Sequence, residues 1–156
     1  MINGPIVNVK KGQQMIKEIR NHGELLAIII DHSYEKPGIS FFTADDLSQQ
    51  LAYMQHPAGH RIDAHVHNRV TREVHYTQEV LVIRKGKLRV DFYDGERVYI
   101  ESHLLVAGDV ILLVSGGHGF KVLEDVEMFE VKQGPYTGEA DKTRFQAVSD
   151  TQVMMK

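Results

Sequence analysis

The most regular alternation of apolar and polar residues lies between residues 87 and 103. Leu88, Val90 and Phe92 alternate with charged residues, which is the spacing of a strand with one buried face. An Asp-Gly step within residues 93–96 is the strongest short signal for a hairpin turn. Residues 97–103 then supply the returning strand. This part of the chain therefore predicts an antiparallel β-hairpin.

Short apolar runs separated by glycines predict further strands on both sides of this hairpin. They lie at residues 25–30, 39–43, 51–55, 79–83, 109–114, 120–123 and 127–132. The run at 25–30 is apolar throughout, which is typical of a strand buried on both faces. Eight or more strands at regular spacing indicate an all-β domain, either a barrel or a jelly roll.

Two short helical segments are expected beside the strands. Residues 11–21 place Met15, Ile16 and Ile19 at helical spacing, and residues 44–50 have room for one helical turn. A chain of 156 residues fits a single domain. We expect its core at about residues 50–133, N-terminal strands within 1–49 and a C-terminal extension at 134–156.

Composition and charge exclude several classes of function. The chain has no cysteine, which rules out a disulfide scaffold, a thiol nucleophile and a thiolate metal site. The net charge of −3 argues against nucleic acid as a partner. No apolar run approaches the length of a membrane span, and the first residues lack the pattern of a signal peptide. A cytoplasmic protein without a membrane partner is therefore expected.

Nine histidines are the unusual feature of the composition, and two of them form the pair His65-x-His67. If this segment is a strand, both imidazoles point to one face about 7 Å apart and can bind one ion. Such a pair would arise by chance in about one of two chains with this histidine content, so it is weak evidence alone.

Two further residues are candidate metal ligands. Glu79 opens an apolar strand and shares a face with Leu81 and Ile83, so its carboxylate must be paired or bound to a metal. His118 lies in a glycine-flanked corner between two strands. The simpler interpretations are a solvated glutamate at a strand end and a histidine in a turn.

The order and spacing of these residues resemble the first motif of the cupin superfamily. Gly59, His65 and His67, then Glu79 and Gly86, match the motif with both flanking spacings intact. The departure is the gap of eleven residues between His67 and Glu79, which is longer than in the family pattern and is interpreted as a lengthened loop. The similarity extends over residues 59–132.

The second cupin motif is matched less well. Gly108 and Gly116 have the expected spacing, but Val114 stands where the motif has proline, and His118 comes one residue early. The tail, residues 132–136 and 141–145, is similar to small single-domain cupins associated with bacterial polysaccharide and sugar-nucleotide pathways.

The resemblance implies a double-stranded β-helix, a jelly-roll barrel, with one divalent transition metal in its mouth. The ligands would be His65, His67, Glu79 and His118, and this donor set suits Fe, Mn, Ni or Zn. The implied function is to act on a small polar molecule, such as a carbohydrate or sugar-nucleotide derivative. An isomerase or epimerase, a dioxygenase, and a non-catalytic module that binds a carbohydrate or small acid all stay open. A homodimer is also expected, with residues 25–30 as a possible intersubunit strand.

Overall fold

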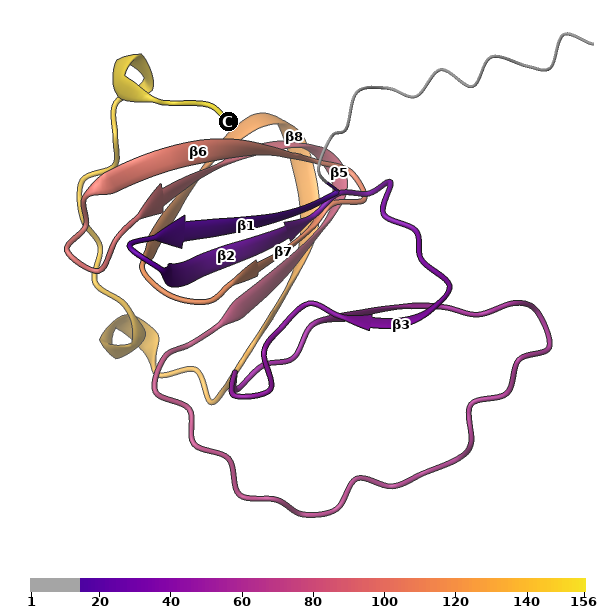
Figure 1. The fold of residues 1–156 in the computed structure, drawn as a ribbon. Helices are drawn as coiled ribbons and strands as arrows, with labels where there is room; N and C mark the ends of the chain where they lie inside the picture. Colours follow the sequence, from indigo (N-terminus) through magenta and orange to yellow (C-terminus); the bar gives the residue numbers. More distant parts are fainter. Residues whose placement is uncertain (1–14) are drawn as a thin grey trace, which may run out of the picture.

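A computed structural model describes residues 15–156, and this part of the chain is almost entirely β-structure (Figure 1). The strands are β1 (Ile16–Asn21), β2 (Glu24–Ile30), β3 (Gly38–Phe41), β4 (Ala52–Gln55), β5 (Glu79–Tyr93), β6 (Tyr99–Val106), β7 (Val110–Leu113) and β8 (Gly117–Lys132). Two 3-10 helices follow, η1 (Gly138–Asp141) and η2 (Asp150–Gln152). The predicted all-β class is confirmed. No helix in the described range is long and apolar enough to cross a membrane.

Six strands form one antiparallel sheet, and Figure 1 shows it strongly curled into a half-barrel. The strand order is β1-β2-β7-β5-β6, and β8 pairs with β5 along its other edge. β5 is 15 residues long, so its first part pairs with β7 and its second part with β6. β3 and β4 form a separate two-stranded sheet.

The curl of the long β5–β8 pair begins at Gly86. The pairing shifts register three times between Ile83 and Leu88, and such bulges bend the strand that carries them. Gly86 has a φ of +82°, and a Cβ atom there would overlap the backbone carbonyl oxygen of Asp125. A residue with a side chain would therefore force the two strands apart at the bend.

Buried side chains gather on both faces of the sheet. One cluster draws on β1, β2, β5, β6 and β7, so it fills the inside of the curl, and Leu81, Phe92 and Leu113 belong to it. The second cluster contains Ile28, Val80 and Leu112 on the outer face. Partly buried residues of the segment 34–51 pack against this outer cluster.

The segment predicted as a helix at 11–21 is a strand where the structure describes it. Residues 11–14 lie outside the described part, and β1 begins at Ile16. Ile16 packs on the outer cluster and Ile19 belongs to the inner one, so the two side chains serve opposite faces. Residues 44–50 form a turn, with a hydrogen bond from the Leu47 amide to the Ala44 carbonyl oxygen.

The prediction that residues 25–30 form an intersubunit strand is wrong. These residues belong to β2, which pairs with β1 on one side and with β7 on the other. Both of its edges are therefore occupied within one chain. The homodimer itself stays a prediction.

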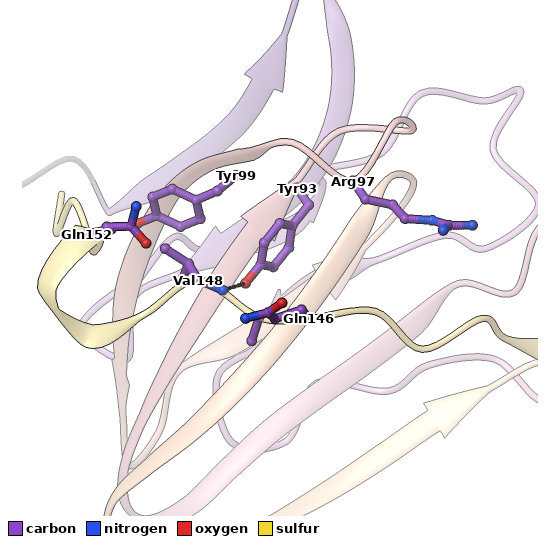
Figure 2. A pocket seen from close by; sticks show the side chains of 7 residues that line it. Tyr93, Arg97, Tyr99, Gln146, Val148 and Gln152 are labelled. Atoms are coloured by element: carbon purple, nitrogen blue, oxygen red, sulfur yellow. Dashed lines mark hydrogen bonds between the residues drawn. The ribbon is translucent and has the colours of Figure 1, made fainter.

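Residues 142–156, here named the C-terminal strap, cross the outside of the β5–β6 hairpin (Figure 2). The amide of Val148 donates a hydrogen bond to the Tyr93 hydroxyl at 2.9 Å, and the amide of Met154 donates one to the Tyr99 hydroxyl at 2.8 Å. The strap and the hairpin enclose a shallow cavity of about 330 Å³, lined by both tyrosines and by Arg97.

Candidate functional site

Glu79 is the first residue of β5 and faces the inside of the curl. In register it lies beside Leu113 of β7 and Lys132 of β8. Side chains in register across a sheet point to the same face, and Leu113 belongs to the inner core cluster. The Glu79 side chain is 13% exposed, so its charge must be compensated by neighbouring groups.

His118 and Lys132 provide that compensation from the two ends of β8. The Nε2 atom of His118 lies 3.3 Å from Oε2 of Glu79, and Nζ of Lys132 lies 3.4 Å from Oε1. The register places His118 opposite Phe92, near the far end of β5 from Glu79. The two residues meet because the strands curl round, and a flat sheet would hold them far apart.

The contacts among these side chains set the protonation states of Glu79 and Lys132. The interaction with His118 lowers the pKa of the Glu79 carboxyl group, against the opposing effect of burial, and the charge of Lys132 lowers it further. Burial opposes protonation of Lys132, but the charges of Glu79 and Glu130 outweigh it and raise the lysine pKa. Glu79 is therefore a carboxylate at neutral pH, and Lys132 is an ammonium group.

His65 and His67 lie in the connection between β4 and β5, and the prediction that they lie in a strand is not met in the structure. Residues 57–76 are exposed throughout, and residues 61–77 belong to no strand or helix. The two imidazole rings meet edge to face, with centroids 5.2 Å apart, and Nδ1 of His65 lies 2.9 Å from the Asp63 carbonyl oxygen. A strand needs a hydrogen-bonded partner, and no neighbouring strand of the described chain pairs with this segment.

The structure thus brings the four predicted ligands together as two pairs, Glu79 with His118 and His65 with His67. Within residues 15–156, one group of three or more acidic or histidine side chains has its ligand atoms within 4.8 Å of one another, and it is a different one. The geometry of a complete four-residue site is therefore not formed by the described positions of these side chains.

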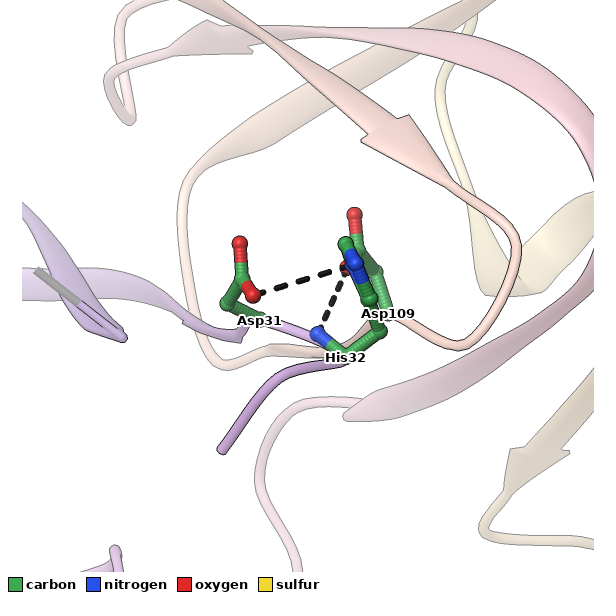
Figure 3. A group of neighbouring side chains, drawn as sticks. All are labelled: Asp31, His32 and Asp109. Carbon is green, nitrogen blue, oxygen red and sulfur yellow. Dashed lines mark hydrogen bonds and ion pairs between the residues drawn. The ribbon is translucent and has the colours of Figure 1, made fainter. Parts of the chain in front are cut away.

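The group that does converge is Asp31, His32 and Asp109 (Figure 3). Nδ1 of His32 lies 3.0 Å from Oδ1 of Asp109 and 3.7 Å from Oδ1 of Asp31. Sequence reasoning missed this group, because Asp109 is 77 residues from His32 and no short motif joins them. The contact with Asp109, followed by the charge of Asp31, raises the pKa of His32.

Hydrogen bonds within the fold account for this triad without a metal. Oδ1 of Asp109 accepts the backbone amide of His32 at 2.9 Å, and its Oδ2 accepts the amide of Val106 at 2.8 Å. The adjoining cavity of about 200 Å³ is also lined by Lys17 and Lys156, whose charges oppose a bound cation. Asp109 therefore ties the β6–β7 turn to the end of β2, although its two carboxylates and imidazole are also a donor set that can hold a metal.

The Glu79–His118 pair also offers ligand atoms to a divalent metal. A carboxylate oxygen and an imidazole nitrogen approach each other on the inner face, and both are ordinary ligands of Mn, Fe, Ni and Zn. The connection between β4 and β5, which carries His65 and His67, ends directly before Glu79. Comparison of the chain with family models, with curated proteins and with solved structures gives no match.

Proposed function

We propose that the protein binds one divalent transition metal through Glu79 and His118, and that His65 and His67 complete the ligand set. The observation that carries the proposal is the 3.3 Å approach of Glu79 and His118 on the inner face of the curled sheet. The two residues come from strands β5 and β8, and the curl of the sheet brings a carboxylate and an imidazole, two ordinary metal ligands, together there. The similarity of the sequence to cupins supports the same four ligands.

The charge next to this pair supports a small polar substrate with an anionic group. Lys132 is protonated and lies on the opposite carboxylate oxygen from His118. If a metal takes the Glu79 carboxylate, the ammonium group loses its main counter-charge and becomes available to a substrate carboxylate or phosphate. A sugar nucleotide or another acidic carbohydrate derivative has this chemistry. A metal with an open coordination position would supply Lewis-acid chemistry to an isomerase or epimerase, or would bind dioxygen in a dioxygenase.

Metal analysis of protein purified without added metal tests the proposal directly. We expect near-stoichiometric metal in the wild type. Titration calorimetry with Mn²⁺, Ni²⁺ and Zn²⁺ should then show at least tenfold weaker binding in Glu79→Gln, His118→Ala and the double variant His65→Ala/His67→Ala.

Two matched histidine variants provide controls for this titration. His75→Ala changes an exposed histidine in the same connecting segment, and His32→Ala changes the triad of Figure 3. Both should bind metal as the wild type does. If the metal content is substoichiometric and no ligand variant changes the affinity, the proposed metal site is wrong. If only His32→Ala weakens binding, the metal belongs to the triad.

A second candidate function is a binding module that holds a carbohydrate or small acid without metal. The contacts of Glu79 favour it. His118 lies on one carboxylate oxygen and Lys132 on the other, so the negative charge of Glu79 is compensated without a metal. Ligands that bind the native state raise the melting temperature. A rise with acidic sugars in the presence of a chelator, lost in Lys132→Met, would favour this function over the metal-dependent one.

A further inference from the structure

β8 has one free edge along its whole length. It pairs only with β5, so the backbone N–H and C=O groups of its other edge have no partner strand among residues 15–156. Eleven of its 16 residues are exposed, and four large apolar side chains, Val122, Leu123, Phe129 and Val131, are between 47% and 57% exposed. A long apolar edge of this kind is a template for another strand.

The connecting segment before β5 has the pattern of a strand but no partner. Ile62, Ala64, Val66 and Val70 alternate with polar residues, and the large apolar ones among them are 59% to 86% exposed. In a strand these side chains would share one face, and His65 and His67 would share the other. No backbone hydrogen bond joins residues 61–77 to any other residue of the described chain.

The charges of the two elements are complementary. Residues 61–74 contain three arginines, one aspartate and one glutamate, and residues 124–130 of β8 contain four carboxylates and no lysine or arginine. Lysines contact three of these carboxylates, Glu124 at 2.7 Å, Glu127 at 4.0 Å and Glu130 at 3.5 Å, so an excess of one carboxylate remains. A second β8 strand on this edge would instead bring acidic stretches together.

The chain also permits the segment to reach the edge. Gln78, at the end of the connection, donates its backbone amide to Oε1 of Gln133, directly after β8. Residues 75–78 would link the segment to Glu79, and four residues span up to about 14 Å when extended. The segment 61–74 can therefore fold back along β8 without any change in the sheet.

From the free edge, the alternation and the charges, we infer that residues 61–74 add to β8 as a seventh strand when metal binds. This inference rests on the proposed metal site. The added strand closes the open side of the curled sheet and carries His65 and His67 toward Glu79 and His118. Metal binding and closure are then one coupled step, because the strand supplies the ligands that hold it in place.

Hydrogen–deuterium exchange with mass spectrometry, with and without the metal that calorimetry selects, tests this closure. We expect the amides of residues 61–74 to exchange at least tenfold more slowly with metal. The β5–β6 turn around Arg97 is an internal control and should not change. The double variant His65→Ala/His67→Ala should show no slowing at the same metal concentration.

A charge-reversal pair separates closure from ligation. Glu124→Lys/Glu127→Lys keeps all four ligands and Lys132 but should reduce the metal-dependent slowing at least threefold, while Glu24→Lys/Glu96→Lys, in β2 and in the β5–β6 turn, should not. Metal binding without slower exchange at 61–74 would overturn closure and leave the metal site standing. Absence of metal binding would overturn the proposed function itself. Slowing that depends on protein concentration would place the strand on a second copy and overturn closure within one chain.

Discussion

The buried ion pair between Arg89 and Asp91 allows a quantitative test of how the outer face of the β5–β6 hairpin is held. Nε and Nη2 of Arg89 donate to the two carboxylate oxygens of Asp91 at 2.8 and 3.0 Å. The side chains are 10% and 4% exposed. Ser102 donates its hydroxyl to the same carboxylate, and Nη1 of Arg89 reaches Asp150 of the C-terminal strap at 2.9 Å. One arginine thus joins a buried charge to the end of the chain.

The substitution Arg89→Met removes the cation and leaves the Asp91 carboxylate buried. Breaking a buried pair in this way costs about 3–5 kcal/mol of unfolding free energy, because the remaining charge has no counter-charge. With a urea m-value of about 2 kcal/mol/M for a domain of this size, the midpoint should fall by about 2 M. Urea unfolding followed by circular dichroism measures both quantities.

Two variants decide whether the buried charge is the cause. Lys121→Met removes a 45% exposed lysine that also contacts Asp150, and an exposed pair is worth about 0–1 kcal/mol. Arg89→Met/Asp91→Leu removes both buried charges and should recover most of the loss. If Arg89→Met costs less than 1 kcal/mol, or if the double variant is less stable than Arg89→Met alone, the argument from an uncompensated charge is wrong.

Three further outcomes are expected from the same structure. Gly86→Ala should lose about 3 kcal/mol or more in urea unfolding, from its positive φ and the overlap with β8, whereas Gly95→Ala, with no atom within 4 Å of the added Cβ, should lose under about 1 kcal/mol. His118 lowers the pKa of Glu79 in the folded state below the ordinary 4.5, so the ionised carboxylate stabilises the fold above pH 4.5. This stabilisation is lost as the pH falls through the folded-state pKa. The unfolding free energy of Glu79→Gln should therefore depend less steeply on pH between 3 and 6 than that of the wild type. Asp109→Ala should cost about 1–3 kcal/mol through two unpartnered backbone amides, and unchanged thermal and urea midpoints would contradict that role.

Local patterns predicted the strands well where each face of the strand is either clearly buried or clearly exposed. The alternation at 87–92 and the Asp-Gly turn correspond to β5 and β6, and the apolar run at 25–30 lies within β2. The segments 79–83 and 87–92 were separate predictions but belong to one strand, because Gly86 bends β5 without ending it. The helix expected at 11–21 failed because two isoleucines at helical spacing serve opposite faces of β1.

In the candidate site, too, residues marked by a local pattern could be predicted, whereas contacts between distant parts of the chain could not. Glu79 at the start of an apolar run predicts a buried carboxylate from sequence alone, and the structure gives it two partners. The triad around His32 could not be found, since its hydrogen bonds depend on which turn lies beside the end of β2. The sequence pattern also cannot decide whether residues 61–74 form a strand, because an alternating segment becomes a strand only when it pairs with the free edge of another strand.

The turn between β7 and β8 explains how His118 comes to face Glu79. Val114 donates its amide to the Leu26 carbonyl oxygen at 2.8 Å, so its backbone is held against β2. Gly116 then turns the chain with a φ of +67°, and a Cβ there would overlap the Tyr93 carbonyl oxygen and the Leu26 side chain. Strand pairing resumes at residue 117, which puts residue 118 opposite Phe92 on the inner face. The length of this turn therefore decides that residue 118 faces inward, which places its imidazole beside the Glu79 carboxylate.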